Sequence, residues 1–154
     1  MTTQKIGSGL ASIRAHRDHL NALVILLDTR LAPRISPEIS ARSTGVTVSN
    51  LSFIPEGRAL KSVVCGSDSG SGHSYVTRIT FDPAGHHCTC PDWAQRHRAC
   101  KHVGALMSEA VAALKVGIGS LDKKIEAFDT RIAGLRADIA AVNQALEVFS
   151  LPTV

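Results

Sequence analysis

Three cysteines and one histidine lie within fifteen consecutive residues and carry the clearest chemical signal in the chain. They form two pairs, Cys88 with Cys90 and Cys100 with His102, in the pattern C-x-C-x9-C-x-H. Structural zinc sites are closed by four thiolate or imidazole ligands in a tetrahedron. The pattern therefore predicts that these four residues bind Zn²⁺, and that no coordination position remains open for catalysis.

Local structure must bring the two pairs together. Residues two apart on an extended segment point to the same side, so a strand running into Cys88 would present its sulfur together with that of Cys90. An apolar helical run begins at Val103, and a helix that starts between residues 99 and 102 would favour the Cys100 thiolate through its N-terminal dipole. Trp93 lies between the pairs and is the expected cover over the sulfurs.

Other roles for the cysteines and neighbouring histidines are less well supported by the sequence. An even number of cysteines in a secreted chain would suggest disulfides, but no secretory signal is visible in the sequence. A catalytic cysteine with a histidine partner would leave the other two ligands idle. Cys65 lies on an apolar strand and is expected to be a small buried side chain. His86 and His87 directly precede Cys88 and could compete as ligands, although turn positions suit them better.

The motif resembles the SWIM zinc-finger family. C-x-C-x(n)-C-x-H, entered through CTCPDW and left through CKH, is the pattern of that family, and the alternating segment Tyr75–Phe81 resembles the strand before its first cysteine pair. The similarity covers roughly Ser74 to Leu114. The resemblance implies a small ββα fold around structural zinc and a role in binding DNA or protein. Such modules accompany Mutator-like transposases, Swi/Snf-type ATPases and recombination accessory proteins, but no such catalytic body is recognisable in this sequence.

Charge gives modest support for a nucleic-acid partner. The chain carries a formal net charge of +4, and Arg96, Arg98 and Lys101 cluster between and beside the expected zinc ligands. Basic side chains on a rigid loop can contact phosphates, whereas the simpler interpretation is a solvated surface loop. DNA is the favoured partner, and RNA fits the same charge pattern.

Two apolar stripes predict long helices at the two ends of the chain. In the C-terminal stripe the steps alternate four and three, the a/d pattern of a coiled coil. Gly117 and Gly119 interrupt it, so we expect a bend or break there and a new start near Ser120. Pro33 and Pro37 should end the N-terminal helix. The C-terminal stripe consists of Met107, Val111, Leu114, Ile118, Leu121, Ile125, Phe128, Ile132, Leu135, Ile139, Val142, Leu146 and Phe149, and the N-terminal stripe of Ile6, Leu10, Ile13, Leu20, Val24, Leu27 and Leu31, with Arg17 as a polar intrusion.

The middle of the chain has the pattern of short strands. We expect a linker over Ser36–Ser43, followed by strands at about Gly45–Ile54, Arg58–Cys65 and Ser74–Phe81. The predicted class is α+β: a three-stranded antiparallel sheet with a zinc-stapled ββα finger, an N-terminal helix, and a long coiled-coil-like C-terminal helix or helical hairpin.

The expected domain organisation has three parts. Residues 1–43 would form the N-terminal amphipathic helix and linker, residues 44–114 the sheet and finger, and residues 115–154 the heptad helix. An amphipathic helix cannot cover its own apolar stripe. The two end helices could pack on each other within the chain, but the C-terminal stripe is longer, so we expect self-association through its heptads.

Two functional classes remain. The first is an oligomeric, zinc-binding, DNA-binding module, and the second is a structural or adaptor protein, such as an assembly or virion component, in which zinc only staples a protein-interaction domain. No phosphate-binding glycine loop, paired carboxylates or serine triad indicates an enzyme. Reduced thiols predict an intracellular, cytoplasmic location, with the nucleoid or nucleus as the site of DNA binding. No stretch approaches the length needed to span a membrane, and no membrane partner is expected.

Overall fold

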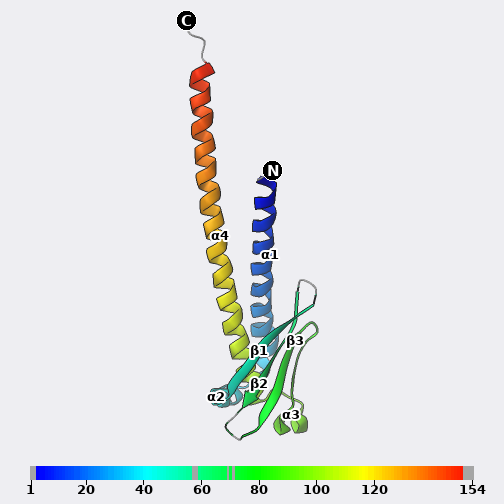
Figure 1. Cartoon of the computed structure of the whole chain (residues 1–154). Coiled ribbons are helices and arrows are strands. Elements are labelled where there is room, and N and C mark those ends of the chain that lie inside the picture. Colours follow the sequence, from blue (N-terminus) through cyan, green and yellow to red (C-terminus); the bar gives the residue numbers. More distant parts are fainter. Residues whose placement is uncertain (1–2, 57–58, 69, 71, 151–154) are drawn as a thin grey trace. The chain divides into compact units, whose positions relative to one another are not determined.

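The computed structural model describes residues 3–56, 59–68, 70 and 72–150. Its contacts divide the chain into two units, one of Asp18–Ile118 and one of Met1–Arg17 with Gly119–Val154. The predicted α+β class, the antiparallel sheet and the long C-terminal helix are confirmed (Figure 1). In chain order the elements are α1 (Thr3–Leu26), the π-helical η1 (Leu27–Leu31), the 3₁₀ turn η2 (Ala32–Arg34), α2 (Pro37–Ser43), β1 (Thr47–Glu56), β2 (Ala59–Asp68), β3 (Ser74–Phe81), β4 (Ala84–Cys88), α3 (Pro91–Arg96) and α4 (Lys101–Ser150).

The sheet has four strands, where the sequence predicted three. Its order is β1-β2-β3-β4, and each neighbouring pair is antiparallel. The additional strand β4 contains His86 and His87, for which the sequence favoured a turn. Its sequence, Ala-Gly-His-His-Cys, lacks the β-branched residues that mark strands, so pairing with β3 imposes the conformation. This pairing sets Cys88 opposite Thr77.

The segment predicted as a linker is instead the helix α2. The Ser36 side chain accepts a hydrogen bond from the Ile39 backbone N–H at 3.3 Å and so caps the helix. Pro37 occupies the first turn, where its missing N–H is not needed. This proline therefore begins a helix, and the N-terminal helix runs through η1 and η2 before it.

The expected break at Gly117 and Gly119 is absent, because α4 is one continuous helix of 50 residues. A helical hairpin and a second start at Ser120 are therefore wrong. A glycine costs a helix only about 1 kcal/mol relative to alanine, which the surrounding turns can offset. Gly117 also has a packing role: a Cβ there would meet Leu20 Cδ1 at 3.2 Å, so the glycine permits close approach of the two helices.

The expectation that no stretch approaches the length needed to span a membrane is wrong. The stretch Lys101–Glu147 of α4 is long enough, and one of its 18-residue windows reaches a mean hydropathy of 1.3. Between Lys101 and Asp122 the only formally charged residues are Glu109 and Lys115. The same stretch supplies buried core side chains to the sheet unit, and a core helix satisfies this test as a membrane span does.

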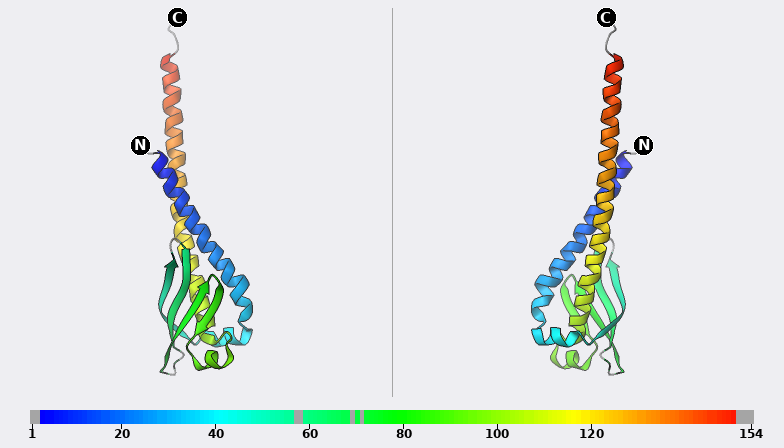
Figure 2. Two further views of the ribbon diagram at one scale, coloured as in Figure 1. Left: turned by 90° about the vertical axis from the view of Figure 1, so that its right-hand side faces the viewer. Right: turned by 90° about the vertical axis from the view of Figure 1, so that its left-hand side faces the viewer.

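The end of α1 with η1, strands β2 and β3, and the start of α4 lie together in the sheet unit (Figure 2). Buried apolar side chains of these elements form its core. A polar contact also links α1 to the sheet, because the Leu60 backbone N–H donates to His19 Nε2 at 3.1 Å. The same unit contains the cysteine–histidine group. The larger buried apolar residues are Leu20, Leu23, Leu27, Leu31, Val63, Ile79, Phe81, Val103, Leu106 and Leu114.

The second unit is an antiparallel pair of helical segments. Arg14 of α1 forms a two-pronged ion pair with Asp129 of α4 at 2.8 and 2.9 Å, and Arg17 lies 3.3 Å from Asp122. The apolar stripe of α4 is therefore partly covered within the chain. Its half-buried members are Leu121, Ile125, Phe128 and Ile132, and its exposed members are Leu135, Ile139, Val142 and Leu146.

Candidate metal centre

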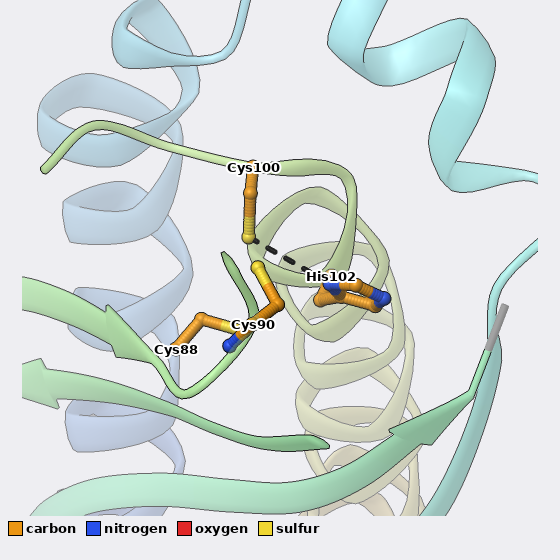
Figure 3. Close-up of side chains that lie close together, drawn as sticks. All are labelled: Cys88, Cys90, Cys100 and His102. Atoms are coloured by element: carbon orange, nitrogen blue, oxygen red, sulfur yellow. Dashed lines mark hydrogen bonds between the residues drawn. The ribbon is translucent and has the colours of Figure 1, made fainter. Parts of the chain in front are cut away.

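Four short pieces of structure converge on the cysteine–histidine group (Figure 3). Cys88 is the last residue of β4, and Cys90 is the N-cap of α3. Cys100 directly precedes α4, where its carbonyl accepts a hydrogen bond from the Gly104 N–H at 3.1 Å. His102 is the second residue of that helix. The predicted helix start between residues 99 and 102 is confirmed, and the segment that contains α3 connects the two pairs of the motif.

The geometry suits a tetrahedral ion. One ligand atom from each of the four residues lies within 4.8 Å of the others, and all four residues are buried. Cys100 Sγ and His102 Nδ1 are 3.9 Å apart. Zinc bonds of about 2.3 Å to sulfur and 2.0 to 2.1 Å to nitrogen give tetrahedral edges of about 3.6 to 3.8 Å. Nδ1 is therefore the ring nitrogen that faces the sulfurs, while the buried Nε2 has no hydrogen-bond partner among the described residues.

Backbone N–H groups hold two of the sulfurs. The Cys90 N–H donates to Cys88 Sγ at 3.5 Å, and the Trp93 N–H donates to Cys90 Sγ at 3.4 Å. The second contact is an N-cap bond in which sulfur replaces the usual oxygen of serine or aspartate. Such bonds stabilise negative charge on sulfur and orient it, so the turn into α3 prepares both thiolates for a cation.

A buried hydroxyl relay supports the same sulfur from the sheet. Thr77 Oγ1 lies 3.3 Å from Cys88 Sγ and 3.0 Å from Ser67 Oγ. Ser67 Oγ also lies 3.1 Å from the Tyr75 carbonyl oxygen. Each hydroxyl has one proton, so Thr77 must donate its proton to a Cys88 thiolate, and Ser67 can then donate either to Thr77 Oγ1 or to the Tyr75 carbonyl oxygen. Sequence reasoning missed both hydroxyls, because only strand register sets Thr77 opposite Cys88.

The electrostatics of the thiols explain why a cation fits. A hydrogen bond from the Cys100 thiol is the largest cause that lowers the pKa of Cys88, to about 3. The same hydrogen bond, with burial, raises the pKa of Cys100 despite the opposing backbone N–H of Val103. The expected stabilisation of the Cys100 thiolate by the helix start is thus outweighed. Burial also raises the pKa of Cys90. A divalent cation would compensate three buried thiolates, and the Cys₃His donor set suits Zn²⁺.

Apolar side chains close the site, and the expectation for Trp93 is confirmed. Trp93 packs with Ile35 and Tyr75 against the cluster that contains the three cysteines. The Trp93 indole N–H donates to His86 Nδ1 at 3.4 Å, and its ring lies 4.4 Å from that of His87. Neither histidine belongs to the metal-binding group found among the described residues.

The remaining cysteine behaves as expected of a small core side chain. Cys65 is buried in β2 and forms no disulfide, as is true of all four cysteines. Burial, followed by the charge of Cys88, raises the pKa of Cys65 to about 11. A protonated thiol is thus retained beside the site, and Cys65 is not a member of the metal-binding group.

The three basic residues singled out in the sequence fall into two settings. Arg96 and Arg98 are exposed and line one cavity, and Arg96 forms an ion pair with Asp92 at 3.1 Å. Lys101, in the first turn of α4, is partly buried and does not line this cavity. Arg34 and Arg42 also line it. Sequence reasoning missed these two because they lie 54 and 46 residues before Cys88, Arg42 within the segment taken for a linker and Arg34 just before it.

The fold and the site together define a zinc-binding module in which a Cys₃His group joins a small antiparallel sheet to a helix. Comparison with protein families gives the same result: residues 65–110 match the family described as SWIM zinc finger. The match begins in β2 and ends in α4, and it covers all four ligand positions in under a third of the chain. The predicted SWIM-type finger and its suitability for zinc are therefore confirmed. No curated protein and no solved structure matches the chain.

Proposed function

We propose that the protein is a non-enzymatic zinc module that binds DNA through the basic surface of its finger and self-associates through α4. A SWIM zinc finger is a binding module. Four protein ligands around one ion leave no open coordination position for catalysis. Thiolate ligands also require a reducing compartment, so a cytoplasmic, nucleoid-associated or nuclear location belongs to this proposal.

The observation that carries the DNA proposal is the exposure of Arg96 and Arg98 on the short segment between the second and third zinc ligands. The ligands Cys90 and Cys100 fix both ends of this segment. Lys101 directly follows Cys100, so three positively charged side chains lie within six consecutive residues that the ligands hold in place. Cations held in this way contact phosphates and release counterions, which makes binding strongly salt-dependent.

Fluorescence anisotropy of labelled duplex and single-stranded DNA, measured with zinc-loaded protein across a salt series, tests this role. The variant R96A/R98A/K101A should lose most of the salt-dependent affinity. The matched control R78A/R131A/K115A removes the same number of positive charges, all of them exposed, from β3 and α4. Equal loss in both variants would mean that net charge alone drives binding, and no binding by the wild type at low salt would remove the DNA role.

Exposed apolar side chains favour a protein partner for α4, and a second copy of the chain is the partner we propose. Leu135, Ile139, Val142 and Leu146 continue the heptad steps of the half-buried residues before them, yet each is about half exposed. Apolar a/d residues in unbroken heptads pair with an equivalent helix. Several fingers would then act together, and multivalency would compensate for weak binding by a single finger.

Sedimentation equilibrium with the variant I139D/L146D tests the self-association. Both side chains are exposed within the single chain, at 59% and 58%, so the substitutions should leave the monomer folded. The wild type should sediment as a dimer or larger assembly and the variant as a monomer. A monomeric wild type at high micromolar concentration would contradict the proposal, and a protein partner other than a second copy would then explain the stripe.

A further inference from the structure

A basic cavity of about 350 Å³ lies between the finger and the segment that precedes the sheet. One wall is formed by η2 and α2, which contribute Arg34 and Arg42. The other wall is formed by α3 and the loop after it, which contribute Arg96 and Arg98. A water molecule occupies about 30 Å³ in the liquid, so the cavity has room for an ion much larger than water.

The charge of the cavity is net positive. Its four arginines face two carboxylates, Glu38 and Asp92. Among the described residues that line the cavity, Arg96 and Asp92 form an ion pair with each other. The other three guanidinium groups have no carboxylate partner among the described residues. Their donors are therefore available to an anion that enters between the walls.

Both walls are attached to the start of α4, so the cavity is held in shape. The finger wall is bounded by Cys90 and Cys100 of the metal-binding group. On the other side, the Ser43 hydroxyl lies 2.9 Å from the Lys101 carbonyl oxygen and so ties α2 to the same helix. Gly104 allows this approach, because a Cβ at that position would clash with the Ser43 side chain. Zinc binding thus orders one wall, and backbone packing places the other against it.

We infer that this cavity binds a backbone phosphate of DNA, with Arg34 and Arg42 donating from one wall and Arg96 and Arg98 from the other. Guanidinium groups donate paired hydrogen bonds to phosphate oxygens, which favours arginine over lysine where a phosphate is held in a fixed geometry. The choice of DNA as the source of the phosphate rests on the proposed function. The contribution of Arg34 and Arg42 to anion binding was not used to argue for DNA binding, which rests on residues of the finger.

Salt-dependent anisotropy with the variant R34A/R42A tests this inference, with R78A/R131A as the charge-matched control. Both arginines of the test variant are exposed, so zinc content and the far-ultraviolet circular dichroism spectrum should stay at wild-type values. Loss of one phosphate contact should reduce the slope of log K against log salt by about 0.9 for duplex DNA, with roughly tenfold weaker binding. The control should change the slope by much less.

A second titration, with inorganic pyrophosphate and NMR detection of the arginine Nε–H signals, separates the cavity from the DNA role. Wild-type DNA binding with R34A/R42A indistinguishable from the control overturns the inference and leaves the proposed function standing. Pyrophosphate shifts that disappear in R34A/R42A, without any DNA binding, overturn the DNA source while supporting the cavity as an anion site. Neither DNA binding nor pyrophosphate shifts in the wild type would overturn both.

Discussion

The zinc module and the helical unit of this protein are specified in different ways. In the module, four buried side chains from the end of β4, the N-cap of α3 and the start of α4 meet around a single point, and their chemistry fixes which segments lie together. In the helical unit, residues of α1 and α4 pair through exposed ion pairs such as Arg14 with Asp129. Exposed ion pairs contribute about 0 to 1 kcal/mol each, so the helical unit depends on apolar contacts that any matching stripe could replace.

The two regions also differ in whether their binding groups are already satisfied within the chain. The ligand positions of the module are all accounted for within the chain. The α4 stripe is half covered up to Ile132 and exposed from Leu135 onward. Metal removal should therefore affect the module far more than the helical unit, and partner binding should do the reverse. The predictions that follow test this contrast from the largest expected effect to the smallest.

Cys100→Ser should abolish stoichiometric zinc binding and unfold the finger. Binding of structural zinc supplies about 10 to 16 kcal/mol in small zinc domains, and that energy is coupled to folding. Hydrogen exchange should show loss of protection in β3, β4 and α3, while amides of α4 beyond Gly119 stay protected.

Cys65→Ser is the matched control for this change, because Cys65 is also a buried cysteine of the sheet unit but lies outside the metal-binding group. It should keep one zinc per chain and lose only stability. Equal zinc loss in the two variants, measured by inductively coupled plasma mass spectrometry, would contradict the assignment of the ligands.

Zinc binding at pH 7 should release about two thiol protons rather than three. The pKa of Cys88 is lowered to about 3, so its thiolate is already formed at pH 7, whereas Cys90 and Cys100 have raised pKa values and still carry protons that zinc must displace. The apparent affinity should therefore rise with pH, by about a hundredfold per unit while two protons are released. Calorimetry in buffers of different ionisation enthalpy measures the number, and a value near three would show that Cys88 is also protonated.

Thr77→Val should weaken zinc binding by about 10 to 100-fold with the fold retained, because it removes the hydroxyl that donates to the Cys88 thiolate. Thr80→Val, in the same strand, removes a hydroxyl that donates to the Pro83 carbonyl oxygen instead. Competition with a chromophoric chelator should show weaker zinc binding for the first variant and unchanged binding for the second. Equal affinities would mean that the relay only stabilises the sheet.

Two glycines of α4 should respond in different ways to replacement by alanine. A Cβ at Gly119 would meet no other described atom within 4 Å, so Gly119→Ala should stabilise the protein by about 0.4 to 1 kcal/mol. At Gly117 the new methyl group would press on Leu20, which should cancel this gain or reverse it. Thermal unfolding of the two variants provides the comparison, and an equal gain at both sites would contradict the close packing at Gly117.

The sequence predicted the site better than the fold around it. The ligands and Trp93 can be recognised from residue types and their spacing along the sequence. The heptad repeat of apolar residues likewise predicts the long helix α4. The strand β4 was missed because its residues have no strand preference, and α2 was missed because Pro37 was expected to end a helix rather than begin one. Pairing with β3 outweighs the weak strand propensity of β4, and the Ser36 cap with Pro37 in the first turn allows α2 to form.

The supporting residues of the site could not be predicted because they are joined only by the fold. The strand register sets Thr77 beside Cys88, and the packing of α2 on the start of α4 brings Arg34 and Arg42 to the finger. The prediction of a helix break at Gly117 was wrong for a related reason. The sequence does not show that Leu20 packs against this glycine and takes the space of a side chain.

X-ray absorption spectroscopy at the zinc edge of the zinc-loaded protein tests the central claim most directly. The account predicts one zinc with three sulfur ligands at about 2.3 Å and one nitrogen ligand at about 2.0 to 2.1 Å. Cys65→Ser should leave the spectrum unchanged. A spectrum with fewer than three sulfurs, or with an oxygen ligand from water, would contradict a closed site formed by Cys88, Cys90, Cys100 and His102.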